Sequence, residues 1–202
     1  MTIVRTGWIR QHVAALRILV VLTVILGLGY PVATWAVGQV LFRNHAQGSP
    51  VESDGRVVGS RLIGQNFTGA AWFHPRASLA GAKGYAAGGD GADGSGGSNL
   101  GPSNPELVKA IRARRAAVAR ENGVAPTQVP PDAVTASASG LDPDISPEYA
   151  AIQVNRVAKA RNVPAADVRR LVERYTYGRQ LGVLGDPHVN VLELNLAVAK
   201  LG

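Results

Sequence analysis

The pattern of hydrophobic and polar positions divides the chain into an apolar N-terminal stretch and a mixed remainder. No charged residue occurs from Ile18 to Phe42, which is longer than the roughly 20 apolar residues that a helix needs to cross the hydrocarbon core of a membrane. A backbone inside lipid must pair its own amides, so an inserted stretch is helical. We therefore expect one transmembrane helix over residues 14–37, with Pro31 kinking it or marking its outer end.

The charges on either side of the apolar run predict its orientation. Arg5, Arg10 and Arg17 precede the run, whereas only Arg43 follows it closely. The positive-inside rule then places residues 1–13 in the cytoplasm and the chain beyond the helix outside. A cleaved signal peptide is the alternative, but the run is longer than the usual apolar region of a signal. Both interpretations export the remainder of the chain.

The remainder predicts one domain that follows a short connection. We expect a stalk over residues 38–55, because the chain is polar and turn-rich from Asn44 to Gly55, and a globular domain over residues 56–202. Residues 56–65 read as short extended segments. Residues 78–101 are rich in Gly, Ala, Ser and Asp, which is typical of a flexible loop. We expect an α+β, helix-rich single exoplasmic domain on one N-terminal transmembrane helix.

Two helices of this domain have clear start and stop signals. The first begins with a capping box of Ser103 and Glu106 and ends at Gly123. The second begins with Ser146 as N-cap, followed by proline at the first helical position, and runs to about Asn162.

A third helix and an ambiguous segment complete the chain. Pro164 opens the third helix, whose apolar residues recur at helical spacing until Gly178. Residues 189–201 fit either a strand or a helix. Asn190 and Glu193 resemble a helix cap pair, which favours a helix there.

Composition excludes some kinds of site. The chain has 21 Lys and Arg against 14 Asp and Glu, a formal charge of +7, and no cysteine. Disulfides and thiolate metal sites are therefore impossible. The basic residues are scattered over predicted helix faces without interleaved aromatic residues, so we expect solvated helix surface and not nucleic-acid binding.

Two segments of small residues have competing interpretations. Residues 134–142, VTASASGLD, either bond their own backbone in a turn or line a site with hydroxyls, and the turn is favoured. Residues 92–102, ADGSGGSNLGP, could offer a nest of backbone N–H groups to an anion. No lysine follows as in a phosphate-binding loop, which favours a linker or turn.

The histidines suggest structural contacts more than chemistry. His74 lies in FHPR and His188 follows Asp186-Pro187, both in expected turns. Neither has a second histidine or carboxylate at metal-ligand spacing, so no metal site is predicted. An anchored hydrolase with a Ser-His-Asp triad is the enzyme alternative, but no partner residues are identifiable for it.

Six segments, preceded by the apolar stretch with its Tyr30-Pro31 step, together resemble the C subunit of the Kdp-type potassium-transporting ATPase. In chain order they are Gly59–Phe67, Trp72–Ser78, Ser95–Pro102, Val134–Pro147, Gln153–Arg161 and Val189–Ala197. The resemblance covers essentially the whole chain. One departure is Asp144, which stands where the family pattern leads us to expect His or Asn.

The resemblance implies a single-pass subunit of the cell membrane that does not itself catalyse. Its implied partners are a P-type subunit that hydrolyses ATP, a channel-like subunit that selects potassium, a small single-helix subunit and membrane lipid. It implies support of assembly and a higher nucleotide affinity of the ATPase subunit, the role of a catalytic chaperone. No cofactor of its own is expected, and ATP enters through the partner ATPase subunit.

The implied role and the expected topology disagree, because ATP is cytoplasmic and the domain is expected outside. An effect on nucleotide affinity can still arise by linkage, if the domain favours one conformation of the pump. The alternative is an exoplasmic cap at the ion entrance, without nucleotide contact. Were nucleotide bound directly, the first candidates are Ser95, Gly96, Gly97, Ser98, Asn99 and Gln153.

Overall fold

The structure, a computed structural model, describes residues 3–86 and 94–201. Part of the glycine-rich segment that was expected to be a flexible loop therefore lies outside the described residues. The chain divides into two compact units, Met1–Ser49 and Pro50–Gly202.

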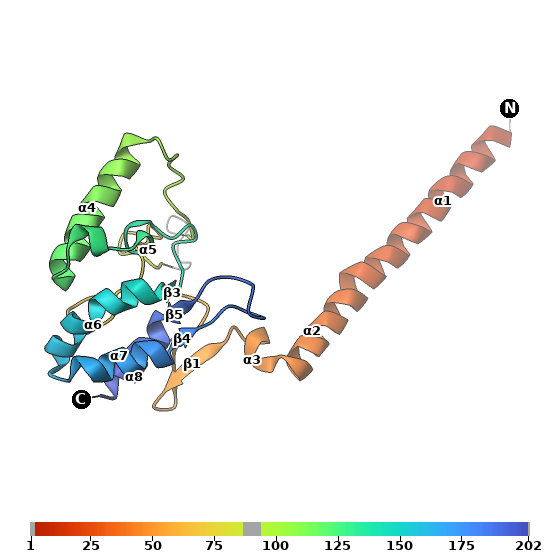
Figure 1. The fold of residues 1–202 in the computed structure, drawn as a ribbon. Helices are drawn as coiled ribbons and strands as arrows, with labels where there is room; N and C mark the ends of the chain where they lie inside the picture. Colours follow the sequence, from red (N-terminus) through yellow and green to blue (C-terminus); the bar gives the residue numbers. More distant parts are fainter. Residues whose placement is uncertain (1–2, 87–93, 202) are drawn as a thin grey trace. The chain divides into compact units, whose positions relative to one another are not determined.

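The first unit is dominated by one long helix. It comprises α1 (Ile3–Val24), a π-helical turn η1 (Ile25–Gly29) and α2 (Tyr30–Leu41), which follow one another without a break (Figure 1). A short helix, α3 (Arg43–Ala46), follows. By length and composition, Gly7–Leu41 can cross a membrane, and it is the one such helix in the described chain. The helix is thus longer than the predicted residues 14–37.

Pro31 does not end this helix, and the structure shows how the chain accommodates it. The N–H of Tyr30 donates to the carbonyl of Ile25, five residues earlier, instead of four. Proline has no N–H, and its ring crowds the preceding turn of a regular α-helix. A wider turn directly before Pro31 relieves this crowding, as π-turns inside helices do.

The second unit begins with a β-hairpin. Strands β1 (Pro50–Ser53) and β2 (Arg56–Ser60) pair antiparallel, with a bulge between Val51 and Glu52. Asp54 and Gly55 connect them with φ of 52° and 73°, the left-handed pair that tight hairpin turns require. The extended prediction for residues 56–65 is confirmed in β2. Strand β1 lies within residues 38–55, which were predicted as a stalk.

A second, three-stranded sheet joins distant parts of the domain. Its order is β3 (Asp144–Ile145), β5 (His188–Asn190) and β4 (Thr176–Tyr177), and both pairings are antiparallel. The central strand β5 leads directly into the last helix, so this sheet fixes where that helix starts.

Helices form most of the domain. They are α4 (Pro105–Asn122), η2 (Pro126–Gln128), α5 (Pro131–Val134), α6 (Pro147–Arg161), α7 (Ala165–Arg174) and α8 (Val191–Ala199). Figure 1 shows α6, α7 and α8 gathered beside the three-stranded sheet, with α4 on the other side of α6. The core between them consists mainly of Phe73, Val134, Ile145, Tyr149, Val154, Val157, Val168, Val189, Leu194 and Val198. The α+β, helix-rich prediction is confirmed.

Two helix boundaries differ from the predicted ones. The N-cap of α4 is Asn104 and not Ser103, because the side chain of Asn104 accepts a hydrogen bond from the N–H of Glu106. Helix α7 ends at Arg174, before Gly178. The chain leaves the helix early because Thr176 and Tyr177 pair with β5.

Two cap predictions are confirmed. The hydroxyl of Ser146 accepts from the N–H of Tyr149 at the start of α6. The side chain of Asn190 accepts from the N–H of Glu193 at the start of α8. The ambiguity over residues 189–201 has a simple origin, since the segment is the end of a strand followed by a helix.

Candidate functional site

An extended segment, residues 72–78, lies among the helices and is held by two buried side-chain amides. The N–H of Phe73 donates to Oδ1 of Asn195 at 2.8 Å, and its carbonyl accepts from Nδ2 at 2.9 Å. The N–H of His74 donates to Oε1 of Gln153 at 2.7 Å, and its carbonyl accepts from Nε2 at 3.2 Å. Buried backbone groups must be paired, and here α6 and α8 supply the partners that a strand would otherwise provide.

Arg156, one turn after Gln153 on α6, extends this network. Its guanidinium donates to Oε1 of Gln153 at 2.6 Å and to Oδ1 of Asn122 at 2.9 Å. Burial lowers the pKa of Arg156, and the neighbouring carboxylate of Glu121 partly opposes this. The same guanidinium donates to the carbonyls of Gly69, Ala70 and Trp72. These bonds close the loop that leads into the extended segment of residues 72–78.

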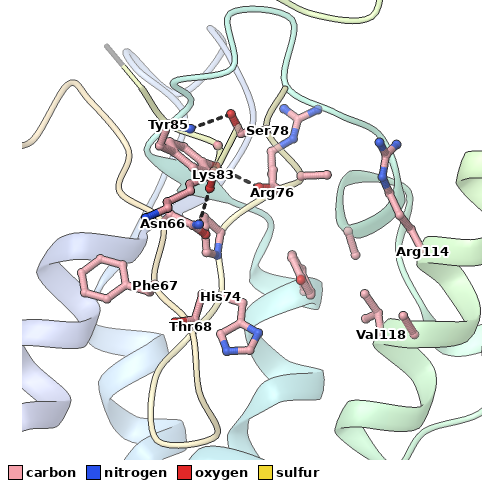
Figure 2. Close-up of a pocket in the computed structure, with 16 residues that line it drawn as sticks. Asn66, Phe67, Thr68, His74, Arg76, Ser78, Lys83, Tyr85, Arg114 and Val118 are labelled. Carbon is pink, nitrogen blue, oxygen red and sulfur yellow. Dashed lines mark hydrogen bonds between the residues drawn. The ribbon is translucent and has the colours of Figure 1, made fainter. Parts of the chain in front are cut away.

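A pocket of about 280 Å³ lies beside the segment (Figure 2). The chain around residues 66–85 forms one wall, and Arg114 and Val118 of α4 face it. The first wall is held by its own contacts: the Asn66 amide donates to the carbonyl of Lys83, and the N–H of Tyr85 donates to the Ser78 hydroxyl at 2.9 Å. The cations on the pocket wall are Arg76, Lys83, and Arg114.

Arg76 links this pocket to the serine-rich segment. Its Nη1 donates to Oδ2 of Asp142 at 2.7 Å, and its buried Nε has no partner among the described residues. The hydroxyl of Tyr85 donates to the carbonyl of Arg76 at 3.0 Å. Burial raises the pKa of the Tyr85 hydroxyl, and the charge of Asp142 raises it further. Tyr85 is therefore a neutral hydrogen-bond donor at neutral pH.

The serine-rich segment VTASASGLD is a turn, as favoured from the sequence. The Ser137 hydroxyl accepts from the N–H of Gly140 at 3.0 Å, and the Ser139 hydroxyl accepts from the N–H of Leu141 at 3.1 Å. The carbonyl of Ser139 accepts from the Ser95 hydroxyl and from the N–H of Gly96, both at 2.8 Å. The two small-residue segments therefore lie face to face, a relationship that the sequence left open.

The structure does not bring the nucleotide candidates into one cluster. Ser95 and Gly96 bind the serine-rich turn, and Gly97 lies close to it, since a Cβ there would be 3.0 Å from the Ala138 carbonyl. Gln153 is 0% exposed, and its amide is occupied by His74 and Arg156. In the described chain, no hydrogen bond joins Gln153 to the candidate loop. Of the remaining candidates, Ser98 bonds the N–H of Leu100, and Asn99 has a φ of 52°.

His74 and His188 both contact other groups of the domain. Nε2 of His74 is 2.9 Å from the carbonyl of Gly69, and its Nδ1 is 3.3 Å from Oε1 of Glu121. His188 stacks on Tyr177, with Nδ1 3.0 Å from the carbonyl of Asp186. Within residues 3–86 and 94–201, no group of three His, Cys, Asp or Glu could hold a metal ion.

Asn195 was not singled out from the sequence, although it fixes Phe73. The signal was present, because Asn195 shares its face of the helix with Val191, Leu192 and Val198 and so interrupts an otherwise apolar face. A buried amide in such a place needs hydrogen-bond partners. The identity of those partners, 122 positions earlier in the chain, was not readable from the pattern.

The fold and its contacts define a class of protein: a small α+β domain that follows one long apolar helix. Comparison with known proteins gives the family. The family described as K+-transporting ATPase, c chain, matches residues 12–200. The chain belongs to this family, so the resemblance found in the sequence is confirmed.

Individual relatives are similar to this chain over almost its full length. The potassium-transporting ATPase KdpC subunit of Kineococcus radiotolerans is 52% identical over 198 residues, which cover 98% of this chain and 97% of the relative. The KdpC subunit of Nitratidesulfovibrio vulgaris is 52% identical over 93% of this chain and 92% of the relative. The KdpC subunit of Paraburkholderia phytofirmans is 51% identical over 91% of this chain and 93% of the relative.

Proposed function

We propose that this chain is a non-catalytic subunit of an ATP-driven potassium uptake complex, and that it supports assembly of that complex. The observation that carries the proposal is family membership over residues 12–200, which include both the apolar helix and the packed domain. The partners are an ATP-hydrolysing P-type subunit, a channel-like subunit and a small single-helix subunit. The helix anchors the chain in the cell membrane with its N-terminus in the cytoplasm and its domain outside.

The domain raises the nucleotide affinity of the ATPase subunit by linkage and not by direct contact. The burial of Gln153 supports this, because a side chain that is 0% exposed and fully engaged has no free group for ATP. Binding that favours one conformation of a partner changes the partner's affinity for its ligand without a shared site.

A second candidate is a structural cap at the ion entrance of the channel-like subunit. The pairing of three carboxylates favours a structural cap and argues against a surface that attracts cations. Asp142 pairs with Arg76, Asp186 pairs with Arg179, and Asp144 accepts from Asn190. Carboxylates that are already paired in a net basic chain attract little additional cation. Neutralising these three carboxylates leaves the apparent potassium affinity unchanged if the domain is a cap.

Gentle extraction of the membrane tests the assembly function. The full chain is expected to co-purify with the ATPase and channel-like subunits, and deletion of residues 1–43 is expected to release it. A matched chain with an unrelated apolar helix in place of residues 7–41 keeps the membrane location and shows whether the helix itself is recognised. Extraction of the intact chain alone, or full potassium uptake with the truncated chain, contradicts the proposal.

A further inference from the structure

The pocket beside residues 72–78 is lined by cations and, within the described chain, by no carboxylate. Arg76, Lys83 and Arg114 line it, with Arg114 on α4 across from the other two (Figure 2). Asp142, which does not line the pocket, pairs with Arg76. Among residues 3–86 and 94–201, neither Lys83 nor Arg114 forms an ion pair. The pocket therefore lies in a positive potential that favours an anion.

The hydroxyl of Tyr149 is a donor without an acceptor at the same pocket. Tyr149 is 4% exposed and lines the pocket, and within the described chain its hydroxyl has no hydrogen-bond partner. Burial raises the pKa of this hydroxyl, and the charge of Glu121 raises it further, so it is protonated at neutral pH. A buried hydroxyl without a partner costs free energy. An acceptor on a ligand in the pocket removes this cost.

The two arginines of the pocket also have N–H groups to offer. Arg76 directs Nη1 and Nη2 to Asp142 and Thr135, and its buried Nε has no partner among the described residues. Arg114 donates to the carbonyl of Val134 at 3.3 Å, which leaves most of its five N–H groups for a ligand. These unmet groups are all donors, so the ligand must present acceptors.

The remainder of the lining sets the size and the polarity of the ligand. Its apolar members are Phe67, Pro75, Ala77, Ala117, Val118 and Ala133. The volume of about 280 Å³ corresponds to the liquid volume of about nine water molecules, so the ligand is small. A carboxylate with an attached apolar group fits both parts of the pocket, because guanidinium and phenol groups donate to carboxylate oxygens while carbon atoms cover the apolar wall.

We propose that this pocket binds a carboxylate that carries a small apolar group, and that Arg114 and the Tyr149 hydroxyl hold the carboxylate. The apolar group lies against the apolar wall. The carboxylate belongs either to a free small molecule or to an acidic residue of a partner chain, and the experiments below separate these two sources. The site goes beyond the proposed function and does not depend on it, because all of its residues lie in the second unit.

Fluorine NMR of the solubilised full chain with 4-fluorobenzoate tests the site. The probe signal is expected to shift and broaden with a dissociation constant below about 1 mM. The neutral 4-fluorobenzamide is expected to bind at least about tenfold more weakly, because it lacks the charge that the arginines attract. Inorganic phosphate lacks the apolar group and should not displace the probe. Absence of binding, equal binding of the amide, or displacement by equimolar phosphate overturns the proposal.

Tyr149→Phe removes only the hydroxyl, and a structural role and a binding role predict different results. We expect about tenfold weaker binding of 4-fluorobenzoate. The unfolding midpoint without the probe should equal or exceed that of the wild type, because an unpaired buried hydroxyl is removed. Tyr175→Phe, at a position that lines a different pocket, should change neither quantity. A destabilised Tyr149→Phe chain, or one that binds the probe like the wild type, overturns the proposal.

Arg114→Gln tests the charge, with Arg115→Gln as its matched control. Arg115 is the next residue of α4, is exposed and does not line this pocket. Arg114→Gln is expected to weaken binding of 4-fluorobenzoate at least about tenfold, whereas Arg115→Gln should change it less than about twofold. Equal losses in the two variants would show a general attraction by the basic helix, and not a site, and would overturn the proposal.

The same titration with the intact, gently extracted complex identifies the source of the carboxylate. If an acidic residue of a partner fills the pocket, 4-fluorobenzoate binds the isolated chain but not the complex. If the ligand is a free molecule, the probe binds both. Either result supports the site, provided that the isolated chain binds. A chain that extracts alone overturns the proposed function and leaves the site intact, whereas an isolated chain that does not bind overturns the site alone.

Discussion

The carboxamide of Gln153 forms two hydrogen bonds with the backbone of His74, at 2.7 Å to its N–H and 3.2 Å to its carbonyl. The carboxamide of Asn195 likewise forms two hydrogen bonds with the backbone of Phe73, the residue before His74. Two side chains from different helices thus replace the strand that would normally pair with an extended segment. This arrangement fixes residues 72–78 against both α6 and α8, and through Arg76 against the serine-rich turn.

Substitution of Gln153 by leucine is expected to destabilise the domain. Leucine has a similar size but leaves the N–H and carbonyl of His74 unpaired, and it removes an acceptor from Arg156. Unpaired buried groups of this kind lower the free energy of unfolding by about 2–4 kcal/mol. Urea unfolding of the solubilised full chain, followed by circular dichroism, measures the change.

Gln128→Leu is the matched control, because Gln128 is exposed and its side chain makes one surface hydrogen bond, to the N–H of Ala125. Its effect is expected to stay below about 1 kcal/mol. The opposite outcome is informative. A Gln153→Leu chain whose unfolding free energy equals that of the wild type would contradict the buried pairing of Gln153 with the backbone of His74.

The sequence predicted those features whose cause is local. The caps at Ser146 and Asn190 depend on residues three positions away, and the apolar helix depends on a continuous run. The pairing of Gln153 with His74 joins residues 79 positions apart, and no local pattern encodes it. Tertiary pairing also overrode local signals, since Thr176 and Tyr177 join a sheet although helical spacing continues toward Gly178.

Gly140 is expected to be intolerant of a side chain. Its φ is +70°, and a Cβ there would lie 2.7 Å from Cβ of Ala80 and 2.8 Å from the carbonyl oxygen of Gly96. Gly140→Ala therefore strains the turn and separates it from the Ser95 loop, with an expected loss of about 1–3 kcal/mol in unfolding free energy. Gly101→Ala is the control, because a Cβ there meets nothing within 4 Å. Equal unfolding midpoints for the two variants would contradict the observed packing.

A reporter fused after Gly202 is expected to show that the domain lies outside the cytoplasm. Alkaline phosphatase, which is active only after export, should be active in this fusion. Replacing Arg5, Arg10 and Arg17 by alanine removes the charge bias that orients the helix, and the activity should fall. The control replaces three exposed arginines of α4 by alanine, namely Arg112, Arg115 and Arg120. An inactive wild-type fusion, or equal losses in both variants, contradicts the topology.

The stability of the domain is expected to depend on pH through Asp144. Burial raises the pKa of this carboxyl, and His188 and the Asn190 hydrogen bond oppose the rise only in part. The folded state therefore binds the proton more tightly than the unfolded state does. The stabilisation from the protonated carboxyl is fully present below the ordinary pKa of 3.8 and is lost as the pH rises through the raised folded-state pKa.

Asp144→Asn tests this dependence, because asparagine cannot ionise and its Oδ1 can still accept from Nδ2 of Asn190, now 3.1 Å away. The variant should be more stable than the wild type near neutral pH, and its advantage should shrink toward about pH 4. Urea unfolding across this range measures the difference, with the exposed Asp54→Asn as control. A difference that is independent of pH would show that the hydrogen bond, and not the buried charge, determines the effect of this residue.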